Sequence, residues 1–179
     1  MDVAHIPVGK KSPHEVNVII EVPMGSDPVK YELDKESGAI FVDRFIHTPM
    51  FYPCNYGFIP HTLSGDGDPV DVLVVCNHPV VPGAVLAARP IGVLLMEDES
   101  GEDEKLIAVP TTKINPFYEK VHALEDLPEL LLSQIKHFFE HYKDLEKGKW
   151  VKVRGWENAD KARSLIEEGI ERAKKSKAA

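Results

Sequence analysis

The chain has 179 residues, of which 43% are hydrophobic and 28% are charged, and its formal net charge at pH 7 is −8. This length and composition predict one globular domain over residues 1–179 and exclude an intrinsically disordered chain. The negative charge argues against a nucleic-acid backbone as the main partner. No apolar run approaches the roughly 18 residues that a membrane helix needs, so no membrane partner is expected.

The two cysteines, Cys54 and Cys76, form neither a CxxC motif nor a disulfide framework. The first residues of the chain lack the basic start and the apolar middle of a signal peptide. Both features predict a reducing, cytoplasmic environment, in which the cysteines act as small buried hydrophobic side chains.

The first two thirds of the chain consist of short apolar runs between turn residues. Residues 1–14 are polar and predict an arm or a short helix, and the aromatic-rich segment 50–60 predicts an irregular loop. The apolar runs predict strands at residues 16–22, 29–33, 40–45, 70–75, 85–88, 91–96 and 106–109. Arg89 and Pro90 separate two of these strands, and Ser100 and Gly101 are the expected tip of a hairpin. The regular spacing predicts a closed or nearly closed β-barrel.

The last third of the chain has helical periodicity. Asp126 is expected to cap a helix that begins near Pro128, and Gly148 is expected to end it. The apolar stripe of this helix is predicted to contain Leu131, Ile135, Phe138, Tyr142 and Leu145.

A final helix follows residues 150–156, which predict a short strand or a connector. Asn158 is expected to cap this helix. Its inward-facing residues are predicted to be Ala162, Leu165, Ile166, Ile170 and Ala173.

The segment Asp66-Gly67-Asp68-Pro69-Val70-Asp71 places three carboxylates immediately before an apolar strand. Gly67 and Pro69 are typical of a turn, and a turn is the simplest explanation for each Asp. Clustered carboxylates are nevertheless costly to bury without a partner, and a hard divalent cation, above all Mg²⁺, is their natural partner. An EF-hand is excluded by spacing, because loop position 6 would be Asp71 and position 12 would be Asn77.

A second acidic cluster covers residues 97–104, and its simplest interpretation is a solvated loop. Two acidic clusters, several tyrosines and basic residues near strand ends together predict a site for a phosphate-rich substrate held by several cations. There is no GxxxxGK[ST] loop and no recognisable nucleophile motif with Ser, Cys or His. The residues alone therefore indicate metal-assisted phosphoryl transfer to water.

The chain resembles the family I soluble inorganic pyrophosphatases, specifically their bacterial, homohexameric branch. The Asp66–Val72 segment resembles the family signature, and further blocks occur in family order over roughly residues 14–175. These blocks are Glu21, Lys30-Tyr31-Glu32, Val42-Asp43-Arg44, Phe51–Gly57, Asp98, Gly101-Glu102-Asp103, Lys105 and His137–Trp156.

This resemblance implies hydrolysis of inorganic pyrophosphate to two orthophosphates, by in-line attack of a metal-bridged hydroxide and without a phosphoenzyme. It also implies an α+β, mainly β fold, namely a five-stranded OB-like closed β-barrel flanked by two main C-terminal helices. A homohexamer built as a dimer of trimers is the expected assembly.

The resemblance also implies a role for each matched residue. Asp66, Asp71 and Asp103 match ligands of the tightest Mg²⁺ site, and Asp98 and Asp103 match ligands of cations that arrive with the substrate. Asp71 also matches a residue that touches the second metal, and it is expected to act in catalysis. Asp68 matches the proposed general base. Glu21 and Glu32 match acidic residues around the metals, and Tyr52 matches a residue of the pocket wall. The groups that match phosphate ligands are Lys30, Arg44, Tyr56, Lys105, Tyr142 and Lys143, of which Arg44 and Tyr56 are also expected to act in catalysis.

Two alternatives from other classes are weighed against this reading. The first is a non-enzymatic OB-like module that binds nucleic acid through its loop aromatics, which the acidic charge opposes. The second is a structural Ca²⁺-binding protein, which would bind metal without releasing phosphate.

Overall fold

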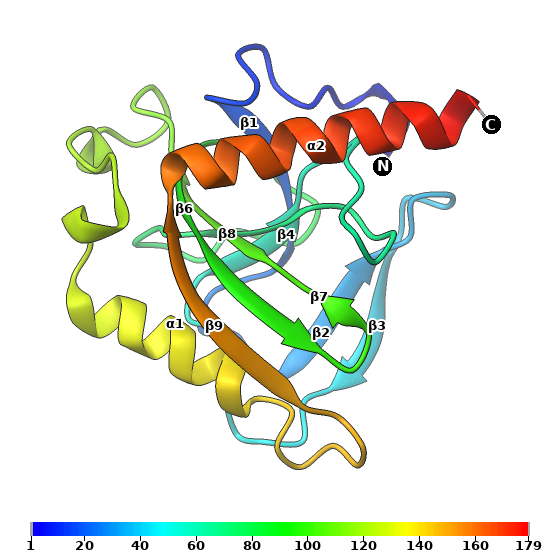
Figure 1. Ribbon diagram of the computed structural model, residues 1–179, viewed down its shortest axis with the longest axis vertical. Helices are drawn as coiled ribbons and strands as arrows, with labels where there is room; N and C mark the ends of the chain where they lie inside the picture. Colours follow the sequence, from blue (N-terminus) through cyan, green and yellow to red (C-terminus); the bar gives the residue numbers. More distant parts are fainter. Residues whose placement is uncertain (1, 179) are drawn as a thin grey trace.

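Five strands close into a ring in the computed structural model, which describes residues 2–178 (Figure 1). The strands are β1 (Val16–Val22), β4 (Asn55–Phe58), β5 (Asp71–Val74), β8 (Lys105–Pro110) and β6 (Val85–Asp98). They are hydrogen-bonded in this order, and β6 pairs back onto β1 to close the ring. All neighbours in the ring are antiparallel except β5 and β8, which are parallel. The predicted mainly β, α+β fold with a closed five-stranded core is confirmed.

Strand β6 is longer than predicted. It runs continuously through Arg89 and Pro90, where two separate strands were expected, so that prediction was wrong. A register shift between Pro90 and Gly92 in the pairing with β8 accommodates the proline, which lacks an N–H for the ladder. The far end of β6 pairs with β7 (Gly101–Glu102) and with β9 (Val151–Asn158). Segment 150–156 is therefore part of a full strand rather than a connector.

Strands β2 (Val29–Leu33) and β3 (Ile40–Phe45) have the predicted bounds but lie outside the ring. They form a separate two-stranded antiparallel sheet, which lies beside the ring in Figure 1. Lys30 and Arg44 are directly opposite each other in this sheet, so two basic side chains start from neighbouring positions.

Two local predictions in the β-rich part were wrong. Strand β4 lies in segment 50–60, which was predicted to be an irregular loop, and it is held by β1 on one side and β5 on the other. In the β6–β7 hairpin, Asp98 is opposite Gly101, so the turn consists of Glu99 and Ser100, one residue earlier than expected.

Helix α1 (Glu129–His141) packs beside β9 and buries Ile135, Phe138 and Phe139. Its N-cap is Pro128, and the predicted cap Asp126 instead accepts hydrogen bonds from the backbone N–H groups of His122 and Ala123. The predicted cap was wrong because the carboxylate closes a local turn before the helix.

The predicted end of α1 was also wrong. The helix ends at His141, seven residues before Gly148, and the chain continues through a series of turns. Tyr142 is buried at the C-cap position, as its place on the stripe suggested, but the side chain of Leu145 is exposed. The predicted helix was therefore too long, because the apolar spacing continues to Leu145 although the helix ends at His141.

Helix α2 (Ala159–Ala178) packs against β6 and runs along one side of the ring (Figure 1). The Asn158 side chain caps it by accepting a hydrogen bond of 3.0 Å from the Lys161 N–H, as predicted. The inward face is confirmed, with four buried residues and one partly buried residue: Ala162, Leu165, Ile166, Ala173 and Ile170.

Alternating side chains of the ring strands belong to two different hydrophobic clusters. Leu73 and Ile107 belong to the cluster that includes α1, whereas Val72 and Leu106 belong to the cluster that includes α2. This alternation follows from the two-residue period of a strand, and it lets one ring anchor both helices.

The remaining predictions concern the cysteines and the N-terminal segment. Cys54 is buried and Cys76 is half-buried, and both are free thiols. The N-terminal segment contains a short 3-10 helix at Val3–His5, as one of its two predicted forms. Among the described residues, no helix has the length and apolar character needed to cross a membrane.

Candidate active site

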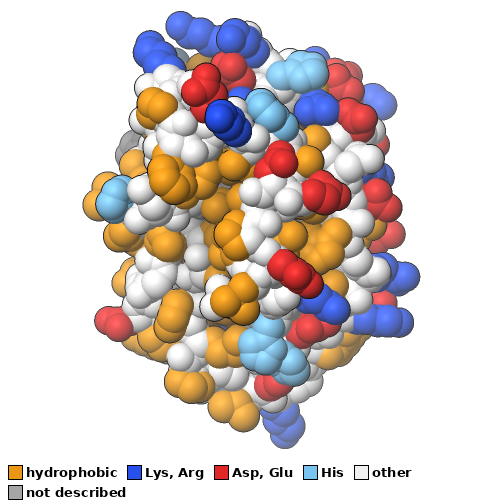
Figure 2. All heavy atoms as spheres, turned by 90° about the vertical axis from the view of Figure 1, so that its left-hand side faces the viewer, with side chains coloured by type: hydrophobic (Ala, Val, Ile, Leu, Met, Phe, Trp, Pro, Cys, Tyr) orange, Lys and Arg blue, Asp and Glu red, His pale blue; other side chains and the backbone are white. Residues whose placement is uncertain are grey.

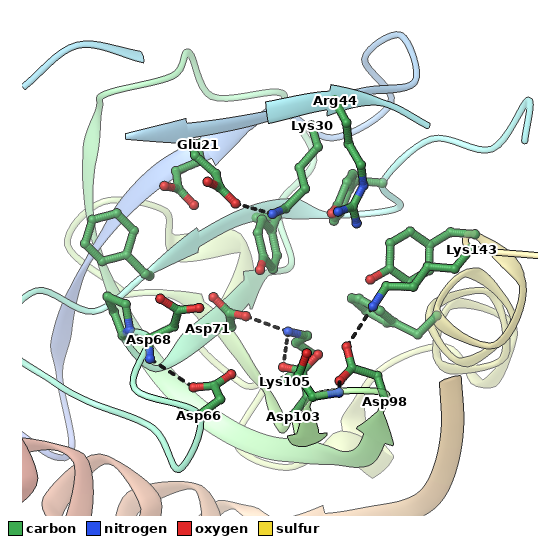
Figure 3. Close-up of a pocket in the computed structure, with 18 of the residues that line it drawn as sticks. Glu21, Lys30, Arg44, Asp66, Asp68, Asp71, Asp98, Asp103, Lys105 and Lys143 are labelled. Atoms are coloured by element: carbon green, nitrogen blue, oxygen red, sulfur yellow. Dashed lines mark hydrogen bonds and ion pairs between the residues drawn. The ribbon is translucent and has the colours of Figure 1, made fainter. Parts of the chain in front are cut away.

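All fourteen predicted site residues line one cavity of about 410 Å³. The cavity collects residues from the ring, from the β2–β3 sheet and from the end of α1. The fourteen residues are Glu21, Lys30, Glu32, Arg44, Tyr52, Tyr56, Asp66, Asp68, Asp71, Asp98, Asp103, Lys105, Tyr142 and Lys143. Figure 3 shows that the labelled acidic and basic side chains point toward one another across this cavity.

The ring places its charged side chains at strand ends. Asp71 is the first residue of β5, and Lys105 is the first residue of the parallel strand β8 and its register partner. Asp98 is the last residue of β6, and the N–H of Asp103 donates to the Met96 carbonyl at 3.0 Å. Strand ends can carry these charges because the side chains project beyond the apolar interior.

Lys105 lies at the centre of the acidic group. Its Nζ is 2.5 Å from Oδ2 of Asp71 and also contacts Oδ1 of Asp103 (Figure 3). Burial disfavours the ammonium ion, but the two carboxylates outweigh this effect and raise the Lys105 pKa well above its usual value. Lys105 is therefore a buried, charged ammonium that neutralises part of the acidic cluster.

The turn before β5 holds Asp66 and Asp68 at the exposed side of the cavity. Asp66 Oδ1 accepts a hydrogen bond of 3.0 Å from the Asp68 N–H, and Gly67 between them has φ of +93°. A positive φ of this kind favours glycine. Partial burial, and then the neighbouring charge of Asp66, raise the pKa of Asp68. A carboxylate with a raised pKa accepts a proton more readily than an ordinary Asp.

Glu21 is a buried carboxylate on β1. Its Oε1 accepts a hydrogen bond of 2.8 Å from the Leu33 N–H, which links the ring to the β2–β3 sheet. Burial is the main cause that raises the pKa of Glu21 to about 7, and the charge of Asp71 adds to it. Glu21 therefore holds its proton to a higher pH than an ordinary glutamate side chain does.

Lys30 and Arg44 project into the cavity from the β2–β3 sheet (Figure 3). Lys30 Nζ lies 3.1 Å from Asp43 Oδ2 and contacts Glu32. Arg44 Nε lies 3.4 Å from Glu146 Oε1. These two cations face the carboxylates of the ring, so the cavity has an acidic side around Lys105 and a basic side, on the β2–β3 sheet, that also carries Glu32.

A second basic position comes from the turn after α1. Lys143 is buried, and its Nζ donates to Asp98 Oδ2 at 2.7 Å and lies 3.6 Å from Glu99 Oε1 (Figure 3). Partial burial opposes ionisation of Asp98, but Lys143 and the Ser100 N–H bind the carboxylate and lower its pKa overall.

Three tyrosines form the deep wall of the cavity. The ring centroid of Tyr52 lies 5.0 Å from that of Tyr56 and 4.6 Å from that of Phe138, and Tyr142 stacks on Phe138 at 5.0 Å. Burial raises the pKa of each of the three phenols above its usual value. The hydroxyl groups therefore stay protonated and can donate hydrogen bonds to an anion.

Eight further residues line the cavity, although the sequence analysis did not predict them as site residues. They are Leu33, Lys35, Phe58, Pro69, Glu99, Ser100, Phe139 and Lys149. Glu99 lies within the second acidic cluster, and that cluster was a usable signal. Lys149, whose Nζ is 3.3 Å from Glu99 Oε1, had no local signal because it reaches the cavity from a long turn.

The donor atoms of the acidic side suit Mg²⁺, which prefers carboxylate oxygens. Within residues 2–178, however, no three His, Cys, Asp or Glu side chains converge as a metal cluster. Lys105 explains this arrangement, since its ammonium lies between Asp71 and Asp103 and Lys143 holds Asp98. The chemistry of the donors fits the cation, and a cation bound there would have to displace or rearrange these lysine contacts.

A family model described as inorganic pyrophosphatase matches residues 18–174. An inorganic pyrophosphatase from Rickettsia bellii is 69% identical over 166 residues, which cover 93% of this chain and 95% of that protein.

Solved structures agree with this match. The structure of the inorganic pyrophosphatase from Thermus thermophilus superimposes with a TM-score of 0.92 at 45% identity, over 97% of this chain and 99% of that one. A structure described as an inorganic phosphatase from Anaplasma phagocytophilum gives a TM-score of 0.93 at 55% identity, over 94% and 99% of the two chains.

Proposed function

Because this chain belongs to the inorganic pyrophosphatase family and is therefore a hydrolase, we propose a specific reaction and mechanism for it. The reaction is the Mg²⁺-dependent hydrolysis of inorganic pyrophosphate to two orthophosphates, in one in-line displacement by water and without a phosphoenzyme. The P–O bond to the leaving phosphate breaks as the bond from water oxygen to phosphorus forms.

One observation carries this proposal. A single cavity combines eight acidic side chains with six basic ones. The acidic side chains are Glu21, Glu32, Asp66, Asp68, Asp71, Asp98, Glu99 and Asp103, and the basic ones are Lys30, Lys35, Arg44, Lys105, Lys143 and Lys149. Acidic groups suit several cations, and basic groups suit a small polyanion. Pyrophosphate bound together with metal ions needs both acidic groups for the cations and basic groups for the phosphate oxygens.

The acidic side is proposed to hold the metal ions. Asp66, Asp71, Asp98 and Asp103 are the proposed direct ligands, with Glu21 and Glu32 around the metal-bound waters. A cation held by these residues would neutralise phosphate charge and would make a water-derived nucleophile available at neutral pH.

The chain's own residues supply proton transfer and positioning. Asp68, whose pKa is raised, is the proposed acceptor of the proton from the attacking water. Lys30, Arg44, Lys105 and Lys143 are proposed to bind phosphate oxygens and stabilise the charge that develops on the leaving group.

The tyrosines complete the proposed phosphate site. Tyr56 and Tyr142 are proposed as hydrogen-bond donors to phosphate, because their phenols are protonated and line the cavity. Tyr52 is proposed to support them as part of the wall, since its ring packs against Tyr56.

The test is release of orthophosphate from pyrophosphate by the purified protein with Mg²⁺, with EDTA, and with Ca²⁺ in place of Mg²⁺. We expect fast release with Mg²⁺, loss with EDTA and suppression by Ca²⁺. No release with any metal from folded protein would overturn the proposal. In that case a gel shift with nucleic acid and a Ca²⁺ titration would test the two binding-only alternatives.

A homohexamer and a cytoplasmic location are part of the proposal. Exposed hydrophobic side chains support self-association, and they include Ile114, Phe117 and Leu130. Figure 2, which views the side of the molecule that carries α1, shows hydrophobic side chains spread between charged ones across that face. Light scattering of the purified protein measures the assembly size directly.

A further inference from the structure

Glu146 is a buried carboxylate that no step of the proposed mechanism uses. Within residues 2–178, the buried acidic side chains are those of Glu21 and Glu146. Glu146 lies in the turn after α1 and is not part of the cavity lining. A buried charge is costly without a partner, so its partner indicates its purpose.

The partner of Glu146 is Arg44, a proposed phosphate ligand. Glu146 Oε1 lies 3.4 Å from Arg44 Nε, and neither atom makes a hydrogen bond within the described part of the chain. The two atoms therefore interact as an ion pair. Nε is the guanidinium nitrogen closest to the side-chain stem, so the contact with Glu146 acts on the stem side of the group, while the outer nitrogen Nη1 lies 3.6 Å from Asp43 Oδ2.

The segments that carry Arg44 and Glu146 are also joined by two other contacts. Thr48 Oγ1 donates a hydrogen bond of 3.4 Å to the Tyr142 carbonyl, and His47 Nδ1 lies 3.3 Å from the Leu145 carbonyl. The end of β3 is thus fastened to the turn after α1. That turn carries Tyr142 and Lys143, which line the cavity, and Lys143 reaches Asp98 at the end of β6.

We propose that Glu146 is a positioning residue that holds the guanidinium of Arg44 at a fixed place relative to Tyr142 and Lys143. The three groups then form one preorganised site for the phosphate oxygens of the substrate. This inference rests on the proposed function, because it assigns Glu146 a role through a phosphate ligand. Preorganisation of this kind lowers the cost of ordering the ligands when substrate binds.

The experiment compares pyrophosphate hydrolysis by Glu146→Gln, Arg44→Gln and the double variant. The matched control is Glu157→Gln, which removes one exposed carboxylate from β9. We expect Glu146→Gln to raise KM about tenfold while kcat changes less than about threefold. In the Arg44→Gln background, the same substitution should change KM by less than about twofold, because the group that it positions is absent.

A second variant separates positioning from folding. Glu146→Asp keeps the buried charge and retracts it by one methylene, and we expect it to fold and to raise KM by an intermediate factor. A purely structural role would lower the melting temperature and the active fraction without this dependence on Arg44.

The proposal is overturned if Glu146→Gln or Glu146→Asp leaves KM unchanged in folded protein, or if the KM effect persists in full without Arg44. If the wild-type protein released no phosphate, the proposed function would fail by itself. Calorimetric binding of inorganic phosphate to the wild type and Glu146→Gln would then still report whether Glu146 orients an anion site.

Discussion

Asp71 and Lys105 are register partners at the first residues of the parallel strands β5 and β8, and their side chains form an ion pair of 2.5 Å. Lys105 also contacts Asp103, so one ammonium links two proposed metal ligands. A divalent cation at these carboxylates has to compete with this lysine. Lys105 therefore offsets part of the negative charge that Asp71 and Asp103 bring to the cavity.

We predict that Asp71→Asn lowers kcat by more than about 100-fold, because loss of one proposed ligand charge weakens metal binding and leaves Lys105 with one anionic partner fewer. The measurement is orthophosphate release at saturating Mg²⁺. Asp160→Asn, at an exposed position on α2, is the control. Turnover by Asp71→Asn within threefold of the wild type would show that Asp71 is not an essential ligand.

Lys143→Ala tests the basic side of the cavity. We expect the loss of a charged hydrogen bond to cost about 1.5–3 kcal/mol of transition-state binding, which corresponds to a fall in kcat/KM of roughly 10- to 150-fold. Lys147→Ala is the matched control, because Lys147 lies in the same turn but is exposed and does not line the cavity. Equal kinetics for the two variants would remove Lys143 from the site.

The sequence predicted which residues line the cavity better than it predicted the contacts between them. The two acidic clusters and the basic residues near strand ends pointed to the region of the cavity, and the individual residues were named because they match the family blocks. The ion pair of Asp71 with Lys105 was not predictable, since the two residues are 34 positions apart and meet only through a parallel strand pairing. Such pairings have no local sequence signal.

The errors in the fold have similar physical causes. Strand β4 has only four residues, and its conformation depends on hydrogen bonds to β1 and β5 on both sides. The end of α1 was misplaced because the apolar period continues to Leu145, whereas the chain leaves the helix at Tyr142. The Tyr142 carbonyl instead accepts a hydrogen bond from Thr48, a contact between residues 94 positions apart.

Gly57 provides a test of the ring itself. A Cβ at this position of β4 would lie 1.9 Å from the Ile19 carbonyl oxygen, so the two strands approach closely only because residue 57 is glycine. We expect Gly57→Ala to lower the free energy of unfolding by about 3 kcal/mol. Gly65→Ala is the control, because a Cβ there meets nothing within 4 Å, and its effect should stay within about 0.5 kcal/mol. Equal urea midpoints for the two variants in EDTA would contradict the close approach.

Glu21 predicts a pH dependence of stability in the metal-free protein. Its pKa is about 7 in the folded chain, against an ordinary value of 4.5, mainly because of burial. Between these two values the folded state keeps a proton that the unfolded state has released. The contribution of Glu21 to stability is therefore complete below pH 4.5 and is lost as the pH rises through 7.

Glu21→Gln isolates this contribution, because the amide does not titrate and can still accept the Leu33 hydrogen bond. The stability of the wild type relative to Glu21→Gln should fall between pH 4.5 and pH 7, by an amount on the order of 3 kcal/mol. Urea unfolding in EDTA at a series of pH values measures the difference, and Glu157→Gln serves as the exposed control. Parallel stability curves for the wild type and Glu21→Gln across this window would mean that burial does not hold the Glu21 proton.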